Sequence, residues 1–500
     1  MSKRKRAIQP TREENYPEWY QSVLQAAELA DHSPVRGCMV IRPWGFAIWE
    51  KMQRYLDQKF KETGHSNAYF PLFVPLHYFE KEAAHVEGFA KECAVVTHHR
   101  LEKGPEGKLV PGGPLEEPLI VRPTSEMIIG HVFAKWIDSY RDLPLLINQW
   151  CNVVRWEMRT RMFLRTTEFL WQEGHTVHAT KEEAEEEAQK MLFVYRDFVQ
   201  GILAIPFIAG EKSASERFPG AVNTYAIEGM MQDRKAIQGA TSHFLGQNFS
   251  RACEISFQNV HGEREFGWGT SWGATTRLVG GLIMAHSDDD GLVLPPRIAP
   301  LHLVILPIAH DASKKEEVVS FAKKVCEQLS SLSFAGEKLQ VSCDVRDLRG
   351  GEKNWSWIKK GIPLRLEIGM REIASGRFAL HRRDRMDEPP LAYTLEELEA
   401  KIPVLLEEIQ EALYQRALLF RRQNTKEIDS LEEFSQFFSG EGGFALCHWN
   451  EDPAIEAKVK EELGVTIRCI PFDKEMRGAP GRCLFTGEPS PGRVLFAKAY

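Results

Sequence analysis

The segment "FLWQEGHTVH" (residues 169–178) places two aromatic rings, a carboxylate and an imidazole at alternate positions. In a strand, side chains two residues apart share one face, so Phe169, Trp171, Glu173 and His175 would all point the same way. A core face would be apolar, and a solvent-facing side has no need of two large rings. The pattern therefore indicates one wall of a binding site.

The residues before this wall could bind a nucleotide. Residues 152–175 read as an apolar strand, a short basic turn and a second strand. Arg155 and Arg165 could clamp phosphate oxygens, which guanidinium groups hold through two parallel hydrogen bonds. Glu157 could accept from an adenine amino group, and Phe169 offers a ring face for stacking. A salt-bridged hairpin without any ligand explains the same residues equally well.

Another arginine follows a run of small residues, "GTSWGATT" (269–276). Small residues let a ligand approach the backbone, and Arg277 could supply a phosphate or stacking contact. The sequence contains neither GxxxxGK[ST] nor GxGxxG, which excludes the P-loop and the Rossmann phosphate site. The segment "SDDDG" (287–291) lacks the twelfth-position acid of an EF-hand loop, so it predicts a turn rather than a calcium site.

Two further segments carry clustered polar side chains. Residues 237–250 contain Gln238, Thr241 and His243, and taken alone they predict a polar loop. Residues 121–136 present Thr124 and Glu126 just before a predicted helix, where Thr124 could simply be the N-cap.

The elements that must position these residues can be read from periodicity. Apolar spacings of three and four predict helices over 45–64 and 181–203, with Gly64 in the place of a C-terminal cap. The apolar run at 67–75 is interrupted by Pro71, which suits an edge strand. Three prolines among apolar residues at 291–301 predict a stiff connector and hence a domain boundary.

Beyond the connector, strands alternate with helices over residues 301–393, which predicts a small parallel or mixed α/β domain. From Arg346 to Arg385, eleven Lys and Arg residues stand against five acids. This stretch is a candidate phosphate-facing surface, although a solvated face accounts for it equally well. The capping box Thr394-x-x-Glu397 then opens a long helical stretch.

The overall composition is that of a soluble globular protein with several domains. The chain has 500 residues, of which 27% are charged and 43% hydrophobic, and its net charge is −7. The longest clean apolar run, 301–309, is half the length needed to cross a bilayer, so no membrane partner is expected. The N-terminus has no apolar core of a secretory signal. Nine cysteines without a CxxC pair indicate free thiols in a reducing cytoplasm.

Together these motifs resemble the class II aminoacyl-tRNA synthetases, and among them the prolyl-tRNA synthetases of archaeal and eukaryotic type. "YFPLFVP" resembles class II motif 1, "VRWE…LRTTEF" motif 2, and "SWGATTRLVGGLIMAHSDDDGLVLPPR" motif 3. "RPTSE", "WQEGHT" and "TSHFLGQNF" are similar to signatures of the prolyl enzymes. The resemblance extends from about residue 15 to Tyr500, with the motifs in the family's order.

The resemblance implies an α/β fold with an α+β catalytic core. A class II antiparallel sheet flanked by helices would occupy residues 1–299, a mixed α/β anticodon-binding domain 300–405, and a small C-terminal α/β domain 406–500. Motif 1 implies a homodimer. The interval between Arg155 and Arg277 is filled by the helix and signatures above, so it has no room for an inserted editing domain.

The chemistry implied by the resemblance is ATP-dependent attachment of L-proline to tRNA(Pro). Proline's carboxylate would attack the α-phosphate of ATP, with Mg²⁺ sharing the charge of the diphosphate, and prolyl-adenylate would pass to the tRNA. Arg155 and Arg277 would be the catalytic residues. The implied ATP site consists of Arg155, Glu157, Arg165, Thr166, Phe169, Gln238, Thr241, Thr275 and Arg277. The implied proline site consists of Thr124, Glu126, Arg155, Trp171, Glu173, His175, His243 and Ser271.

Within the implied proline site, a carboxylate from Glu126 or Glu173 suits the cationic amine, and Trp171 offers the ring a flat wall. The basic α/β domain would read the tRNA anticodon, and no DNA partner is expected. Proline anticodons end in two guanines, whose edges suit Arg or Lys paired with an acid. The candidate readers are Arg346, Glu352, Lys353 and Arg365.

The last domain departs from the family pattern. Relatives commonly hold zinc there with four cysteines, but here Cys447 and Cys483 remain while Asp452 and Thr486 stand at the other two positions. Two thiolates rarely make a closed structural site, so zinc is not expected. Cys469 is expected in the core. The family's final tyrosine is present as Tyr500, and in relatives the C-terminus lies toward the active site.

Two alternatives remain open at this point. Another class IIa synthetase, above all the threonyl enzyme, would need a zinc-binding Cys and two His in its pocket, and that set is not found. A non-catalytic, synthetase-like RNA-binding accessory protein would usually lack the phosphate-binding arginines, whereas Arg155, Arg165 and Arg277 are all present.

Overall fold

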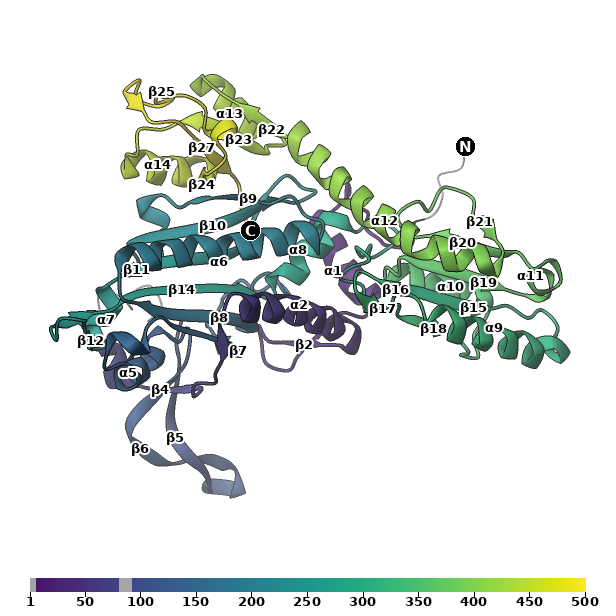
Figure 1. Ribbon diagram of the computed structural model, residues 1–500, viewed down its shortest axis with the longest axis horizontal. Coiled ribbons are helices and arrows are strands. Elements are labelled where there is room, and N and C mark those ends of the chain that lie inside the picture. The colour runs from purple at the N-terminus through teal and green to yellow at the C-terminus, as the bar shows by residue number, and fades with distance from the viewer. Residues whose placement is uncertain (1–5, 81–91) are drawn as a thin grey trace.

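The computed structural model describes residues 6–80 and 92–500 (Figure 1). Its centre is an 11-stranded sheet with the order β22-β23-β27-β24-β9-β10-β11-β14-β8-β7-β3. Neighbours from β10 to β7 run antiparallel, as the class II resemblance implies. These strands are β10 (Asn223–Met230), β11 (Ala236–Gly246), β14 (Trp268–Thr275), β8 (Glu168–His178) and β7 (Leu145–Val154).

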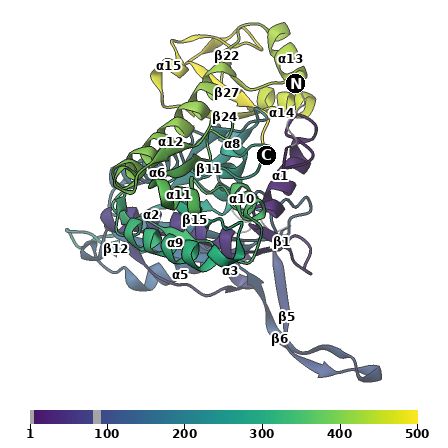
Figure 2. The ribbon, with the colours of Figure 1, turned by 90° about the vertical axis from the view of Figure 1, so that its right-hand side faces the viewer.

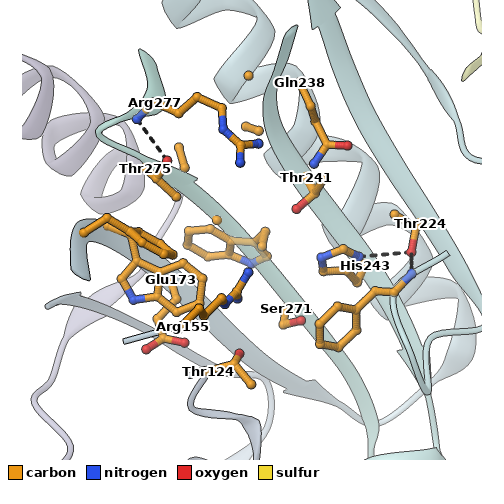
Figure 3. A pocket seen from close by; sticks show the side chains of 18 of the residues that line it. Thr124, Arg155, Glu173, Thr224, Gln238, Thr241, His243, Ser271, Thr275 and Arg277 are labelled. Atoms are coloured by element: carbon orange, nitrogen blue, oxygen red, sulfur yellow. Dashed lines mark hydrogen bonds between the residues drawn. The ribbon is translucent and has the colours of Figure 1, made fainter. Parts of the chain in front are cut away.

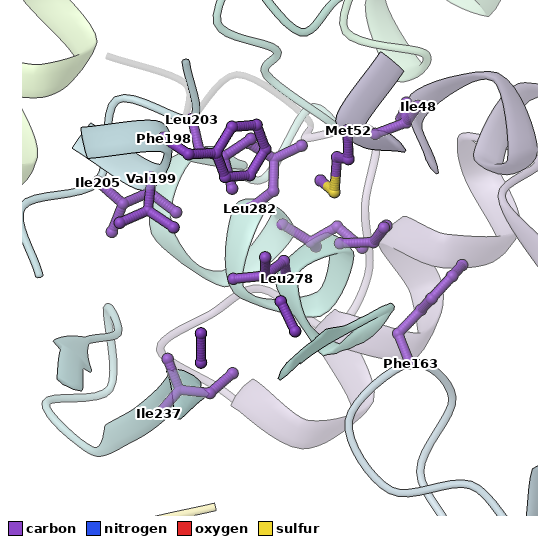
Figure 4. Packing of buried hydrophobic residues seen from close by; sticks show 14 of the residues in the cluster. Ile48, Met52, Phe163, Phe198, Val199, Leu203, Ile205, Ile237, Leu278 and Leu282 are labelled. Atoms are coloured by element: carbon purple, nitrogen blue, oxygen red, sulfur yellow. The ribbon is translucent and has the colours of Figure 1, made fainter. Parts of the chain in front are cut away.

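Helices cover one face of this sheet. Helix α6 (Lys181–Gly201), α8 (Arg277–His286) and α2 (Pro43–Glu62) share one buried apolar cluster with it. Figure 4 shows Leu278 and Leu282 of α8 packed between Met52 of α2 and Phe198 of α6. The helices predicted over 45–64 and 181–203 are confirmed within two residues at each end. The opposite face of the same strands is left free to hold a ligand.

The motif 1 region forms short edge strands. Strand β3 (Ser66–Asn67) lies at the end of the large sheet, and β4 (Phe73–Pro75) at the edge of a three-stranded sheet. Both strands are edge strands, which confirms the edge-strand prediction for this region. Pro71 lies between them, outside either strand. The other two strands of the small sheet, β5 (Ala94–Lys103) and β6 (Leu109–Val121), extend away from the body as a long arm (Figure 2).

Residues 303–393 form a separate five-stranded sheet with the order β18-β15-β19-β20-β21. Parallel pairing of β15 with both β18 and β19, and antiparallel pairing of β19 with β20, confirm the predicted mixed α/β fold. The strands are β15 (Leu303–Pro307), β18 (Val341–Cys343), β19 (Leu364–Ile368), β20 (Phe378–Arg382) and β21 (Leu391–Tyr393). Its helices are α9 (Lys315–Leu329), α10 (Gly350–Lys359) and α11 (Met370–Ser375).

Helix α12 (Leu395–Gln423) begins with the predicted capping box of Thr394 and Glu397 and runs without a break past residue 405. It leads to the last unit, whose strands join the large sheet because β24 (Thr466–Pro471) pairs with β9 (Ile208–Glu211). The remaining elements of this unit are β22 (Thr425–Glu427), α13 (Leu431–Ser439), β23 (Phe444–His448), α14 (Pro453–Leu463) and β27 (Arg493–Ala497). Among the described residues, no helix is both long and apolar enough to cross a membrane.

Candidate active site

A cavity of about 410 Å³ opens over strands β8, β14 and β11. Figure 3 shows Arg277 and Gln238 at one end of it and Thr124 at the other. The structure brings together around this cavity every residue of the two substrate sites implied by sequence. These are Thr124, Glu126, Arg155, Glu157, Arg165, Thr166, Phe169, Trp171, Glu173, His175, Gln238, Thr241, His243, Ser271, Thr275 and Arg277.

Strand β8 supplies one wall through its alternation. Phe169, Trp171, Glu173 and His175 line the cavity, while Gln172, on the other face, accepts a hydrogen bond from Tyr195 of α6 at 2.5 Å. The unbroken pleat therefore places the aromatic, acidic and imidazole side chains on the ligand side. The segment mixes polar and aromatic residues because one face of the strand lines the cavity and the other face contacts helix α6.

The floor of the cavity consists of residues aligned across three strands. His175 of β8 lies opposite Ser271 of β14, which lies opposite His243 of β11. The buried Ser271 hydroxyl has no hydrogen-bond partner among the described residues. A buried polar group normally has a partner, so a ligand that accepts or donates at this hydroxyl would fit the site.

Gln238 and Thr241 of β11 both reach the cavity because the strand contains a β-bulge. The register with β10 shifts between Ile227, which faces Ala240, and Glu228, which faces Gln238. The extra residue, Gly239, reverses the alternation, so Gln238 lies on the same side as Thr241 and His243 (Figure 3). The polar loop predicted for residues 237–250 is therefore wrong for 237–246, which are strand.

Glu173 is held inside the protein by several donors. Its Oε1 accepts from Ser125 Oγ at 2.5 Å and from Gln149 Nε2 at 2.6 Å, and its Oε2 lies 3.0 Å from His175 Nε2. Burial favours the neutral acid, but these bonds outweigh it and lower the pKa of Glu173. Glu173 is therefore an anion whose oxygens are largely occupied by the protein itself.

The two histidines of the floor have opposite electrostatic surroundings. Burial opposes the charge on His175, but the bond to Glu173 outweighs it and raises the pKa of His175. Burial, with the charge of His175, lowers the pKa of His243 to about 3. His243 is thus neutral, and its Nδ1 lies 3.0 Å from Thr224 Oγ1. One end of the floor is ionic and the other is an uncharged ring.

Glu126 is the other carboxylate of the pocket. It is the first residue of helix α5 (Glu126–Trp136), where a negative charge suits the helix dipole. The Thr124 hydroxyl donates to Glu126 Oε2, and both residues are buried. The residue at the N-cap position is Ser125, so the interpretation of Thr124 as the N-cap is wrong. Thr124 instead lines the cavity beside Glu126.

Three arginines converge on the cavity from different segments. Arg155 follows β7, Arg165 precedes β8, and Arg277 opens helix α8, with its backbone N–H bonded to Thr275 Oγ1 at 3.0 Å (Figure 3). Burial, followed by the charges of Arg155 and Arg165, lowers the pKa of Arg277 to about 10. The positive charges of these guanidinium groups repel one another, so a bound polyanion would stabilise them. Guanidinium also matches the geometry of phosphate groups.

Arg155 connects the two ends of the cavity. Its Nε donates to the Pro123 carbonyl at 3.0 Å, and its guanidinium lies 5.6 Å from the ring centroid of Phe169 and 5.7 Å from that of Trp171. Glu157 approaches Arg165 only to 3.9 Å, and the Arg165 side chain is half exposed. Such a pair contributes little on its own, so a salt-bridged hairpin does not explain why these charges face a cavity.

Sequence reasoning missed one part of the lining. Glu92 and the segment after β9 also face the cavity, and this segment contributes Lys212, Glu216, Arg217 and Phe218. Phe218 stacks on His243 with ring centroids 4.6 Å apart. The segment "EKSASERF" has no periodicity; the only signal was the density of charge followed by one aromatic residue.

The four candidate anticodon readers are not equivalent. Arg346 is exposed and paired with Asp344, and Glu352 is exposed at the start of α10. Lys353 is buried, and its Nζ donates to the Asp344 carbonyl at 3.0 Å. Arg365 is also buried, with its Nη1 unpaired among the described residues, and it lines a cavity of about 160 Å³. Lys353 is thus placed to support the backbone rather than to touch RNA.

The cysteines of the last unit belong to its interior. Cys447 and Cys483 are buried in one apolar cluster, and Cys469 is buried in another, as expected for the core. Asp452 caps helix α14 through the backbone N–H of Ala454. Within residues 6–80 and 92–500 there is no group of three or more His, Cys, Asp or Glu side chains that could hold a metal ion.

Three family models match the chain. They describe a tRNA synthetase class II core domain (G, H, P, S and T) over residues 113–286, an anticodon binding domain over 302–405, and a prolyl-tRNA synthetase C-terminal domain over 431–500. The first contains the three arginines of the cavity, and the second contains the four candidate anticodon readers.

Curated relatives match the chain over almost its whole length. Proline--tRNA ligase 2 of Anaeromyxobacter dehalogenans is 57% identical over 99% of this chain and 98% of that protein. The proline--tRNA ligase of Rhodopirellula baltica is 58% identical over 100% and 99%, and that of Bdellovibrio bacteriovorus 56% over 99% of each. The chain therefore belongs to the prolyl-tRNA synthetases, the class II ligases that attach proline to tRNA with ATP.

Proposed function

We propose that the cavity over β8, β14 and β11 activates L-proline with ATP and then transfers it to tRNA(Pro). The single observation that carries this proposal is the convergence of Arg155, Arg165 and Arg277 on a cavity whose other end is a small, partly ionic floor. A triphosphate fits the first end and an amino acid the second. The family membership makes threonyl activation or a non-catalytic accessory role the weaker explanations.

In the first step, a carboxylate oxygen of proline attacks the α-phosphorus of ATP and diphosphate leaves, so that prolyl-adenylate forms. Arg155, which lies between the two ends, orients the carboxylate and the α-phosphate. Arg277 stabilises the charge that develops at phosphorus, and Phe169 with Arg277 would sandwich the adenine. No protein base is needed, because the attacking group is already an anion. Glu157, Arg165, Thr166, Gln238, Thr241 and Thr275 complete the ATP site.

At the other end, Glu126 is the better partner for the cationic amine of proline. Glu173 already accepts bonds from Ser125, Gln149 and His175. Among the described residues, the Glu126 side chain has a hydrogen bond only with the Thr124 hydroxyl. Glu173 would then act by fixing His175 and Ser125. Trp171 provides the apolar wall for the pyrrolidine ring, and His243 and Ser271 close the floor.

In the second step, the terminal ribose hydroxyl of the tRNA attacks the carbonyl carbon of prolyl-adenylate, and AMP leaves. The unit over residues 302–405 would bind the anticodon. Arg346 and Glu352, which are exposed, would contact RNA directly, and Arg365 would do so from its small cavity. Lys353 would support Arg346 by holding Asp344. The division into 1–299, 300–405 and 406–500 remains our proposal for the domain organisation.

Mg²⁺ would enter with ATP. Since the described residues offer no preformed group of metal ligands, the phosphate oxygens would supply most of them. When bound, the ion neutralises charge on the leaving diphosphate.

Zinc in the last unit is not expected, and one tightly bound equivalent in metal analysis would contradict this. We also propose a homodimer and, from the nine free cysteines, a cytoplasmic location.

The direct experiment is proline-dependent exchange of diphosphate into ATP, followed by charging of tRNA(Pro), with purified wild-type protein and Arg277→Gln. The variant should lose exchange by on the order of a hundredfold or more, because it removes a charge that acts on the transition state. Arg196→Gln, on the outer part of α6, is the matched control and should keep wild-type exchange. Full exchange by Arg277→Gln would remove the proposed role of this arginine.

A further inference from the structure

The C-terminal unit, residues 431–500, supports part of the pocket wall. We call residues 212–218, which follow β9 and line the cavity, the wall segment. Strand β24 of the C-terminal unit pairs with β9, with Ile470 opposite Glu211 and Pro471 opposite Gly210. Strand β9, which leads into the wall segment, therefore lies inside the sheet only because the C-terminal unit supplies β24 as its neighbour.

Helix α14 of the same unit binds the wall segment through two side chains. Ser213 Oγ donates to Glu456 Oε1 at 2.8 Å, and Lys460 Nζ lies 2.9 Å from Glu216 Oε1 (for α14, see Figure 1). Glu456 and Lys460 are four residues apart, so they lie on one face of the helix. Ser213 and Glu456 are 2% and 3% exposed, so the hydrogen bond between them is shielded from water. The Lys460 pair is exposed and contributes less.

A buried ionic group ties down the start of the wall segment. Glu228 of β10 is fully buried and accepts from Lys212 Nζ at 3.1 Å and from Arg468 Nη2 at 3.0 Å. Lys212 Nζ also donates to the Arg468 carbonyl at 2.8 Å. Because buried charges require partners, Arg468 of the C-terminal unit is part of what keeps Lys212 and Glu228 in place.

The far end of the wall segment reaches the floor of the cavity. The Phe218 N–H donates to Thr224 Oγ1 at 2.9 Å, and that hydroxyl is also bonded to His243 (Figure 3). Phe218 stacks on the same histidine. His243 in turn lies in the row with Ser271 and His175. The wall segment is thus fixed at one end by the C-terminal unit and packs at the other against the floor.

We propose that the C-terminal unit positions the proline end of the pocket, with Glu456 and Arg468 as positioning residues that hold the wall segment so that Phe218 keeps His243 in place on the floor beside the bound amino acid. This inference rests on the proposed activation of proline in this cavity. It gives the C-terminal unit a role that does not depend on zinc. Neither residue touches substrate, so their effect passes through Ser213, Lys212 and Phe218.

The test is proline-dependent exchange with Glu456→Ala in the full-length chain. Loss of one buried bond to a charged group should raise the KM for proline about tenfold, while the KM for ATP stays within about twofold of wild type. Glu456→Gln keeps an oxygen that can accept from Ser213 and should restore the KM for proline. Glu461→Ala, at an exposed position of the same helix, is the matched control and should be indistinguishable from wild type.

Ser213→Ala provides an independent variant that leaves the C-terminal unit intact. It should raise the KM for proline like Glu456→Ala, and the double variant should be no worse than either single one. Additive effects, an unchanged KM for proline in both single variants, or equal increases in both Michaelis constants would overturn the inference. A wild-type protein without proline-dependent exchange would instead refute the proposed function, so the two failures are distinct.

Discussion

Arg383 donates two hydrogen bonds to Asp288, from Nη2 to Oδ1 at 2.6 Å and from Nη1 to Oδ2 at 2.7 Å. Asp288 lies two residues beyond helix α8, which begins at Arg277 in the cavity. Arg383 belongs to the segment matched by the anticodon-binding model, and its Nε donates to the Ile358 carbonyl in α10. The helix that carries Glu352 and Lys353 is thereby bonded to the end of the helix that carries Arg277.

Arg383→Met should therefore separate tRNA charging from adenylate formation. The substitution removes both hydrogen bonds to Asp288 and the bond to the Ile358 carbonyl at the end of α10. The anticodon-binding unit then loses its fixed orientation relative to α8. We expect charging of tRNA(Pro) to fall at least about tenfold, while exchange without tRNA stays within about threefold. Because Asp288 is about a third exposed, the loss in unfolding free energy should be moderate, about 2 kcal/mol.

Lys401→Met serves as the control for Arg383→Met, since Lys401 is an exposed cation on α12. Steady-state charging and exchange should be measured on the same preparations. Equal losses of both activities in Arg383→Met would show that the ion pair stabilises the fold without linking the two units.

Glu173→Ala should weaken proline activation far more than ATP binding. The change removes the common acceptor of Ser125, Gln149 and His175 and leaves buried donors without a partner. The KM for proline in the exchange reaction should rise at least about tenfold, and the KM for ATP should change by less than about threefold. Unchanged parameters for proline would remove Glu173 from the site.

Two further variants serve as a control and a comparison for Glu173→Ala. Glu168→Ala, at the exposed start of β8, should behave as wild type. Glu126→Gln keeps the shape of the side chain but removes the charge that we assign to the amine, so it should be at least as damaging for proline as Glu173→Ala. If Glu126→Gln binds proline normally, the assignment of the amine to Glu126 is wrong.

His302 should make stability fall on acidification. Burial, with the charge of Lys51, lowers the pKa of His302 to about 3, and its Nδ1 accepts from the Gln340 N–H at 2.9 Å. Between the unfolded pKa near 6.5 and the folded value, only the unfolded chain binds the proton. This contribution to stability is intact above pH 6.5 and is lost at up to about 1.4 kcal/mol per pH unit below it.

The measurement is thermal unfolding of wild type and His302→Gln from pH 7.5 to 4.5. Glutamine can still accept from Gln340 but does not titrate, so the variant should show a shallower loss of stability with falling pH. Parallel curves for the two proteins would mean that His302 is not neutral in the folded state.

Tyr500 should support the turn of motif 2. Its hydroxyl donates to Asp233 at 2.6 Å, its N–H donates to the Ala236 carbonyl, and the guanidinium of Arg161 lies 5.7 Å from its ring centroid. Deletion of Tyr500 should lower kcat/KM for ATP about tenfold, since about 1.4 kcal/mol of cation–π and hydrogen-bond energy is lost beside that turn. Tyr500→Phe, which keeps the ring, should retain most of the activity. A fully active deletion variant would contradict this role.

Much of the site could be predicted where periodicity is regular. The alternation of Phe169, Trp171, Glu173 and His175 survives in β8 because the strand has no bulge and each face meets one environment. The sequence of residues 237–246 predicts a loop because the bulge at Gly239 breaks the alternation on which strand prediction depends. A single extra residue thus concealed the strand that carries Gln238, Thr241 and His243.

The rest depended on tertiary contacts that local patterns do not encode. The wall segment has no secondary structure beyond one short 3-10 turn, and its place is set by Glu456 and Arg468, far away in the sequence. Lys353 and Arg365 look like surface cations in a basic stretch, but the fold buries both. Local charge therefore located the anticodon-binding unit without identifying which of its cations reach the surface.

The most direct test of the whole account is amino-acid-dependent exchange of diphosphate into ATP, run with each of the twenty amino acids. The account predicts strongest exchange with proline, with weaker exchange for the neighbours alanine or cysteine, because a pocket separates ligands of similar size by only about 10- to 200-fold. Strongest exchange with any other amino acid, or none with a well-folded protein, would contradict the assignment of Trp171, His175 and Ser271 to a proline pocket.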